Sequence, residues 1–213
     1  MFEEIKQCVI SGDEQRAVQL TQRLLDQGND PHKVLKEGLV AGMDVVGARF
    51  KAYDLWLPEV ILAAKAMKAA TALLKPHLEK SGGAMKLGKI VIATVEGDVH
   101  DIGKNLVSMM LESVGFDMAD LGVNVKVAAI AEAAVKEKAD IVGLSALLTT
   151  TMLGMKPAIK AIRGGNARLK VMVGGSPITQ EYANEAGADG FAPDALRAIT
   201  LARNLMGLKV TAG

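Results

Sequence analysis

Apolar residues in the first 80 positions recur every three or four places, which is the spacing of amphipathic helices. Short polar breaks interrupt this pattern at Ser11-Gly12 and Gly28-Asn29, and such residues are typical of helix ends. Four helices are expected, with starts near Phe2, after a cap at Asp13, at Asp30-Pro31 and at Pro58. Because short connections join them, these helices predict a small four-helix bundle over residues 1–80.

From residue 88 onward the pattern changes to short apolar runs that alternate with helical stretches. Five strands are expected, at 89–95, 116–121, 141–145, 171–175 and 188–191. The first helix is expected to end near Val114, and the three others to cover 126–138, 152–162 and 194–206. This alternation predicts an α/β domain over residues 88–213, with a five-stranded parallel sheet of the flavodoxin or Rossmann-like class. The order of the strands in the sheet does not follow from the sequence.

The two parts also differ in glycine, because only five of the 22 glycines lie in residues 1–80. A Ser-Gly-Gly stretch between them predicts a linker over residues 81–87. The formal net charge of +1 gives no electrostatic case for binding nucleic acid or an anionic membrane. The apolar runs are too short to span a bilayer, the N-terminus is unlike a signal peptide, and Cys8 is the single cysteine. These features favour a cytoplasmic protein.

The residues that could carry chemistry follow the first predicted strand, where His100 stands two residues after Asp98 and three before Gly103. Two other loops follow predicted strands: one runs from Ser145 to Thr151, and the other contains Gly174-Gly175. In a parallel sheet, all three loops lie at the carboxyl edge, where open α/β sheets bind ligands. Glycines permit a ligand to approach the backbone, and hydroxyls supply hydrogen bonds without charge. The sequence therefore predicts a ligand-binding site at this edge.

Each signal also has a simpler structural interpretation, which the residues alone leave open. Ser145 suits a backbone hydrogen bond at a strand end, and one residue of the threonine run 149–151 suits a helix cap. Gly174-Gly175 suits a plain turn. An aromatic cluster near the start of the fourth helix suits the core of the bundle, and it consists of Phe50, Tyr53 and Trp56.

Taken together, Asp98-x-His100-x-x-Gly103, Ser145-x-Leu147 and Gly174-Gly175 resemble the cobalamin-binding signature of corrinoid proteins. The helical first part is similar to the cap domain that precedes the cobalamin domain in methionine synthase and in the corrinoid subunits of one-carbon methyltransferase systems. The resemblance covers nearly the whole chain.

The resemblance implies that cobalamin binds base-off, with its own base detached and with His100 as the lower ligand of cobalt. It also implies that Asp98 accepts a hydrogen bond from the His100 ring and that the Thr151 hydroxyl extends this relay. Trp56 matches the position of an aromatic ring over the cobalt-bound methyl group. The other cofactor-binding residues that it implies are Val99, Asp101, Ile102, Gly103, Ser145, Leu147, Thr149, Gly174 and Gly175.

By the same resemblance, the chain is expected to carry a methyl group between the methylcobalamin and cob(I)alamin states and to lack a complete catalytic cycle of its own. A donor-specific methyltransferase would load it from an aryl methyl ether, a methylamine, a betaine or methanol, with an O-demethylase or methylamine system favoured. An acceptor methyltransferase would pass the methyl group to tetrahydrofolate or a thiol. A reductive activating protein and a second copy of the chain, in a homodimer, are further expected partners. Two alternatives stay open, a cobalamin-sensing regulatory module and the cobalamin subunit of a mutase.

Overall fold

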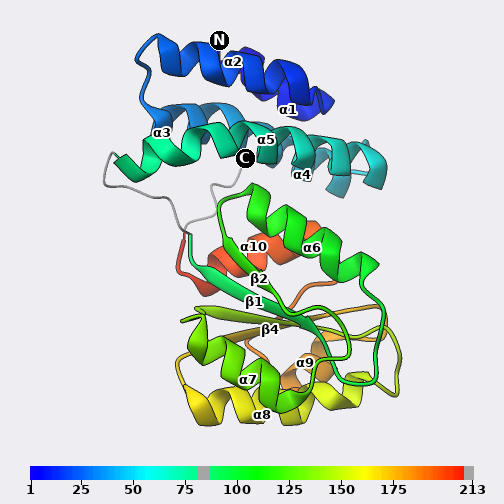
Figure 1. Ribbon diagram of the computed structural model, residues 1–213. Coiled ribbons are helices and arrows are strands. Elements are labelled where there is room, and N and C mark those ends of the chain that lie inside the picture. The colour runs from blue at the N-terminus through cyan, green and yellow to red at the C-terminus, as the bar shows by residue number, and fades with distance from the viewer. Residues whose placement is uncertain (81–86, 209–213) are drawn as a thin grey trace. The chain divides into compact units, whose positions relative to one another are not determined.

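The computed structural model describes residues 1–80 and 87–208, and the chain divides into two compact units between Met85 and Lys86 (Figure 1). The linker predicted at 81–87 lies, except for Leu87, outside the described residues. Its limits therefore stay a prediction.

The first unit consists of helices throughout its described residues. Their bounds are α1 (Phe2–Ser11), α2 (Glu14–Asp26), α3 (Pro31–Lys33), the π-helix η1 (Val34–Val40), α4 (Ala41–Lys51) and α5 (Leu57–Lys80). The four predicted helices are present, and the third is a continuous helical stretch made of α3, η1 and α4. The π-helical turn within it was not predicted. The predicted cap also forms, because the Asp13 carboxylate accepts a hydrogen bond from the Arg16 amide at 3.0 Å.

The second unit alternates strands with helices. Its elements are β1 (Lys89–Thr94), α6 (Ile102–Ser113), β2 (Asp117–Asp120), α7 (Val127–Lys136), β3 (Ile141–Ser145), the 3-10 helix η2 (Met152–Gly154), α8 (Met155–Gly165), β4 (Lys170–Gly174), α9 (Gln180–Ala186), β5 (Gly190–Phe191) and α10 (Ala195–Leu205). The strands form one parallel sheet in the order β2-β1-β3-β4-β5, which is the flavodoxin-like order. The predicted α/β fold class is confirmed. Sequence reasoning missed α9.

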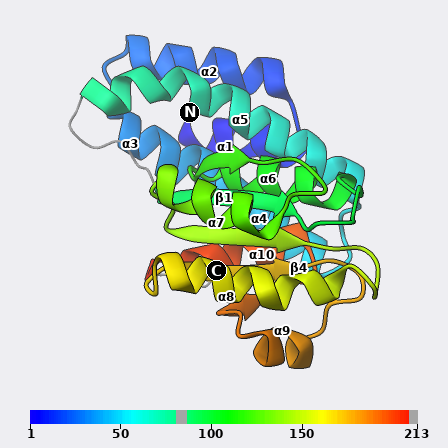
Figure 2. The same ribbon diagram turned by 60° about the horizontal axis from the view of Figure 1, so that its bottom comes forward.

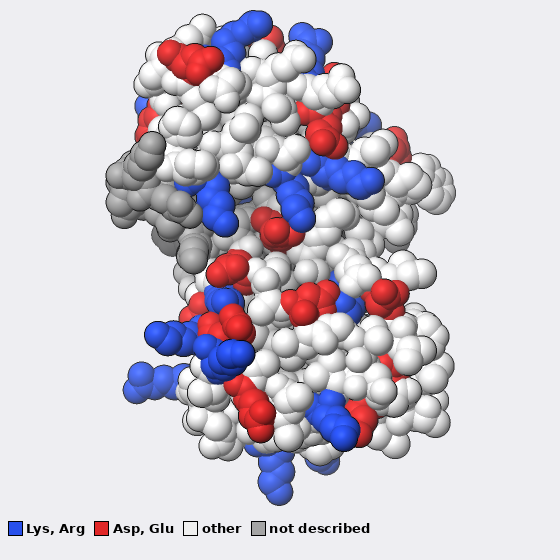
Figure 3. All heavy atoms as spheres, in the orientation of Figure 1, with Lys and Arg blue, Asp and Glu red and all other residues white. Residues whose placement is uncertain are grey.

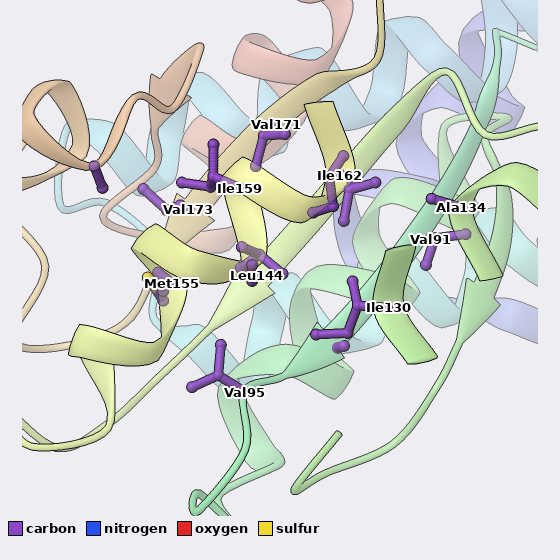
Figure 4. Close-up of a cluster of buried hydrophobic side chains, with 14 of the residues drawn as sticks. Val91, Val95, Ile130, Ala134, Leu144, Met155, Ile159, Ile162, Val171 and Val173 are labelled. Carbon is purple, nitrogen blue, oxygen red and sulfur yellow. The ribbon is translucent and has the colours of Figure 1, made fainter. Parts of the chain in front are cut away.

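Helices cover both faces of this sheet, which explains why its central strands read as continuous apolar runs. Figures 1 and 2 show α6 and α10 on one face and α7 and α8 on the other. Alternate residues of β1, β3 and β4 pack against α7, α8 and α9 in the cluster of Figure 4, to which Val91, Leu144, Val173, Ile130 and Ile159 belong. Burial of each large aliphatic side chain contributes about 1.5–3 kcal/mol. The sheet is thus a firm base for the loops at its carboxyl edge.

Basic and acidic side chains are interspersed on the face of the molecule in Figure 3, in keeping with the formal net charge of +1. Among the described residues, no helix is both long enough and apolar enough to cross a membrane.

Candidate functional site

The candidate site lies at the carboxyl edge of the sheet, where the loops after β1, β3 and β4 begin side by side. The strand register pairs Thr94 with Ser145 and Ser145 with Gly174, so the last residues of the three strands stand at one level. The strand order changes direction between β1 and β3, and ligands of open α/β sheets bind at such a switch point. The three loops that the sequence singled out therefore meet at one edge.

The carboxylate of Asp98 joins the first two of these loops. Its Oδ1 accepts hydrogen bonds from the His100 amide at 3.0 Å and from the His100 ring Nδ1 at 2.8 Å. Its Oδ2 accepts from the Leu147 amide at 2.8 Å and from the Thr151 hydroxyl at 2.6 Å. These four hydrogen bonds use both oxygens of a side chain that is fully buried.

The same contacts fix the charge of Asp98. Burial alone raises the pKa of the Asp98 carboxyl, but hydrogen bonds from Thr151, Leu147 and His100 outweigh burial and hold this pKa well below its usual range. Asp98 is therefore ionised at neutral pH and acts only as an acceptor.

An ionised Asp98 decides how the imidazole of His100 is presented. Because Asp98 only accepts, Nδ1 of the neutral ring carries the hydrogen, and Nε2 offers its lone pair. The His100 side chain is 46% exposed, whereas that of Asp98 is fully buried. The site therefore holds one half-exposed imidazole in a fixed orientation, with a nitrogen lone pair that can bind a metal.

Several exposed apolar side chains lie on the same two loops and on the helical turns that follow them. Ile102, for example, is 85% exposed at the start of α6. The others with large exposed fractions are Val99, Leu147, Leu148 and Leu153. Exposed apolar side chains gathered on the loops of one sheet edge are typical of a ligand or partner surface. The predicted residues Asp101 and Thr149 are also exposed, and Ser145 is half-buried.

Two of the predicted glycines have different structural roles. Gly175 has a φ of +131°, and a Cβ there would overlap the carbonyl oxygen of Ala146, so the loops after β3 and β4 approach closely only with glycine. The Ala146 amide donates to the carbonyl of the adjacent Gly174 at 3.3 Å. At Gly103, in contrast, a Cβ would meet no atom within 4 Å, so the fold does not require glycine there.

Two of the three clustered aromatic residues do not belong to the core of the first unit. Trp56 is 75% exposed and Tyr53 is 89% exposed, so the bundle-core interpretation is wrong for both, whereas Phe50 is half-buried. Trp56 precedes α5, and its amide donates to the Glu59 carboxylate at 2.6 Å. Trp56 belongs to the first unit, and its position over a cofactor stays a prediction.

Thr151 is not a side-chain cap of the helical turn that follows it. Its hydroxyl instead donates to Asp98 and lies 3.1 Å from the Leu148 carbonyl oxygen. The capping interpretation of the threonine run is therefore wrong for Thr151.

Sequence reasoning missed three residues that support the site. The Lys104 side chain is almost fully buried, forms an ion pair with Asp120 and donates to the Asn105 amide oxygen at 2.7 Å. The Thr94 hydroxyl donates to the His100 carbonyl at 2.9 Å. The Asn124 Oδ1 accepts a hydrogen bond from the amide of Gly97, the residue before Asp98. Only Lys104 had a signal in the sequence, as a cation one residue after the glycine of the motif.

We expect Gly103→Ala and Gly175→Ala to change the free energy of unfolding in opposite directions. Alanine at position 103 stabilises by about 0.5 kcal/mol, because it favours helix and its Cβ enters open space. Alanine at position 175 destabilises by more than about 2 kcal/mol through strain and overlap. Denaturant unfolding of the ligand-free full chain measures both effects. If Gly103→Ala destabilised the protein, the space around a Cβ at position 103 would not be open.

Asp98→Asn is expected to destabilise the ligand-free second unit by about 2–4 kcal/mol near neutral pH, because an amide cannot replace four hydrogen bonds to a carboxylate. The folded pKa of Asp98 is depressed, so its contribution is complete above the unfolded pKa of about 3.9 and is lost as pH falls toward the folded value. The difference in the free energy of unfolding between wild type and Asp98→Asn should therefore be constant near neutral pH and become smaller in acid.

Circular dichroism during denaturant unfolding at several pH values tests this expectation. Trp56, the single tryptophan, lies in the first unit, so its fluorescence serves as an internal control that should be the same in both proteins. If this difference in free energy stayed constant down to strong acid, the pKa of Asp98 would be the same in the folded and unfolded states, and the expectation would be wrong.

Comparison with known proteins agrees with the resemblance seen in the sequence. A family model described as a B12 binding domain matches residues 88–200, and a second model with the same description matches residues 1–75. Each unit therefore has its own family match.

Relatives match along nearly the whole chain. A corrinoid protein of Desulfitobacterium hafniense is 42% identical over 212 residues, which cover 97% of this chain and 98% of the relative. The dimethylamine corrinoid protein of Methanosarcina barkeri is 40% identical, covering 97% of each chain. The crystal structure of a methanol:cobalamin methyltransferase complex from Methanosarcina barkeri contains a chain that matches with a TM-score of 0.80 and 28% identity, covering 95% of this chain and 78% of that chain. The chain therefore belongs to the family of B12-binding corrinoid proteins.

Proposed function

We propose that this protein is a methyl carrier that binds cobalamin base-off at the carboxyl edge of the sheet, with Nε2 of His100 as the lower ligand of cobalt. The observation that carries the proposal is the Asp98–His100 hydrogen bond of 2.8 Å, made by a buried carboxylate to a half-exposed imidazole. A carboxylate on the far nitrogen is the usual support of a metal-binding histidine, since it fixes the tautomer and strengthens the donor.

The residues around His100 suit a large, flat cofactor. A corrin supplies the equatorial ligands of its metal, so the protein needs to add a single donor, and one oriented imidazole is what this edge presents. The exposed apolar side chains of Val99, Ile102 and Leu147 give such a macrocycle a surface that excludes water. The open space above Gly103 leaves room for the cofactor to approach the start of α6. Gly174, Gly175 and the hydroxyls of Ser145 and Thr149 would line the path of the displaced nucleotide tail.

Bound cobalamin supplies a carbon–cobalt bond that can be made and broken, whereas the protein binds, orients and shields the cofactor. In this assignment His100 ligates the metal, Asp98 orients the ring, and Thr151 holds the second oxygen of Asp98. Trp56, exposed at the start of α5, would cover the methyl group.

Partner enzymes would perform the two transfers. One methyltransferase would load the methyl group and another would pass it to tetrahydrofolate or a thiol, in line with the methyltransferase complex that contains a structural relative. A reductive activating protein, a homodimer and a cytoplasmic location stay predictions. No specific observation favours the regulatory module or the mutase subunit.

The methyl donor that we propose is a methylamine. A dimethylamine corrinoid protein matches this chain at 40% identity along nearly its whole length. Among the solved structures, a monomethylamine corrinoid protein is 33% identical to this chain and the chain from the methanol system is 28% identical. Aryl methyl ethers and betaines have no support of this kind and serve as competitors in the test.

His100→Ala is expected to abolish protein ligation of cobalt. The full chain is loaded with cobalamin, and the cobalt is reduced to its paramagnetic state for electron paramagnetic resonance. The nitrogen splitting of the wild-type spectrum should change when histidine is labelled with the heavy nitrogen isotope, and it should be absent from His100→Ala. His77→Ala, an exposed histidine on α5, is the matched control. If the nitrogen splitting of the wild-type spectrum did not change on isotope labelling of histidine, the cofactor would have kept its own base, and the assignment of His100 would be refuted.

Loading by purified methyltransferases identifies the donor. We expect the dimethylamine or monomethylamine enzyme to methylate the reduced, cobalamin-loaded protein at least about tenfold faster than the methanol or aryl methyl ether enzyme, a preference of about 1.4 kcal/mol. The absorption change on cobalt methylation gives the rates, and cobalamin free in solution gives the background. Faster loading from methanol or an aryl ether would overturn the methylamine assignment but leave the carrier function intact.

A further inference from the structure

The loop that carries Asp98 and His100 is held by a connection that the sequence motif does not include. This connection joins β2 to α7 over residues 121–126. The Asn124 amide donates to the carbonyl of Asp98 at 2.8 Å, and the Gly97 amide donates to the Asn124 Oδ1 at 2.8 Å. Asn124 thus makes two hydrogen bonds to consecutive residues of the loop, one with its backbone and one with its side chain.

The backbone conformation of Asn124 makes this pair of contacts possible. Its φ is +53°, in the left-handed region, which asparagine and aspartate tolerate better than other residues with a Cβ. Glycine would adopt this φ freely but would lack the side-chain acceptor. The position therefore calls for two properties at once, a left-handed backbone and a short side chain that accepts a hydrogen bond.

Thr94 holds the other end of the loop and is itself bonded to the same connection. Its side chain is fully buried and donates to the His100 carbonyl at 2.9 Å. Its backbone amide donates to the Gly122 carbonyl at 3.0 Å, and the Val125 amide donates to its carbonyl at 3.1 Å. The backbone from Gly97 to His100 is thus bonded to Asn124 at one end and, at the other end, to Thr94, which is itself bonded to the same connection.

We propose that Asn124 is a positioning residue for the lower ligand of cobalt. The inference rests on the proposed function, because it assumes that His100 binds the metal. A bond between imidazole and cobalt requires a particular direction of the Nε2 lone pair, and this direction depends on how Asp98 holds Nδ1. Without the Asn124 acceptor, the Gly97–Asp98 backbone loses one of its two hydrogen bonds to the connection, and the Asp98 carboxylate is less well oriented.

Two variants of Asn124 separate positioning from backbone conformation. Asn124→Gly keeps the left-handed backbone and removes the side-chain acceptor, whereas Asn124→Asp keeps both. Lys138 is a matched control, because its φ is also +53° and it follows α7 near the opposite end of that helix. Lys138→Gly therefore relieves the same kind of backbone strain without touching the loop of His100.

The experiment measures histidine ligation by electron paramagnetic resonance of the full chain loaded with cobalamin. We expect Asn124→Gly to lower the ratio of histidine-ligated to histidine-free cobalt about tenfold, the lower end of the usual loss when a group that orients a metal ligand is removed. Asn124→Asp should restore the ratio to within about twofold of wild type, and Lys138→Gly should leave it unchanged. A second readout needs no cofactor: hydrogen exchange of the Gly97 amide should accelerate in the ligand-free Asn124→Gly protein and not in Asn124→Asp.

Two outcomes would overturn the inference. One is a wild-type ligation ratio in Asn124→Gly, and the other is an equal loss in Asn124→Gly, Asn124→Asp and Lys138→Gly, which would indicate a general effect on stability. His100→Ala in the same series tells the two proposals apart. If His100→Ala keeps the nitrogen splitting, the proposed function itself fails. If His100→Ala loses the splitting and Asn124→Gly keeps it at the wild-type level, only the positioning role of Asn124 fails.

Discussion

The buried carboxylate of Asp98 is the interaction on which the rest of the site depends. Its four hydrogen bonds come from the loop after β1 and from the loop after β3, which are about fifty residues apart in the chain. A buried carboxylate without such partners is costly, so the second unit folds fully only when these two loops close on each other. The closure that satisfies Asp98 also fixes the half-exposed His100 ring with Nδ1 on the carboxylate, which leaves Nε2 unused by this contact. The orientation of the imidazole is therefore a consequence of folding and does not require a ligand.

The strand order explains why this loop can be held so firmly. β1 lies between β2 and β3, so the connection after β1 has a neighbouring connection on each side. From the β3 side, Leu147 and Thr151 bind the carboxylate of Asp98, and from the β2 side, Asn124 binds its backbone. At the edge of the sheet, the same loop would have one such neighbour. The switch point thus supplies space for a ligand and lateral support for the residue that meets it.

The sequence predicts the local features of this structure better than the distant contacts. All five strands were predicted, and β1, β3 and β4 are buried apolar runs that a short window of sequence contains. The Asp98–His100 pair is equally local, because its residues are two positions apart. Helix α9 was missed because seven residues carry little periodicity, although Thr179 caps its start and Gly187 ends it in the left-handed region. The π-helical turn differs too little from an α-helix over its length to alter an apolar pattern. Thr94 and Asn124 could not be identified, because their contacts depend on a strand order that one sequence does not specify.

Lys104 extends the same frame to the helix that follows the motif. An ammonium group in the first turn of α6 is opposed by the helix dipole, and burial adds to its cost. The ion pair with Asp120 offsets these terms, and the other oxygen of Asp120 accepts from the Gly122 amide at 2.8 Å. The connection after β2 is therefore bonded to Thr94 and to the loop of His100, and Asp120, the last residue of β2, joins this connection to the start of α6. A shift of Asp120 and the connection together would therefore move the imidazole and the start of α6.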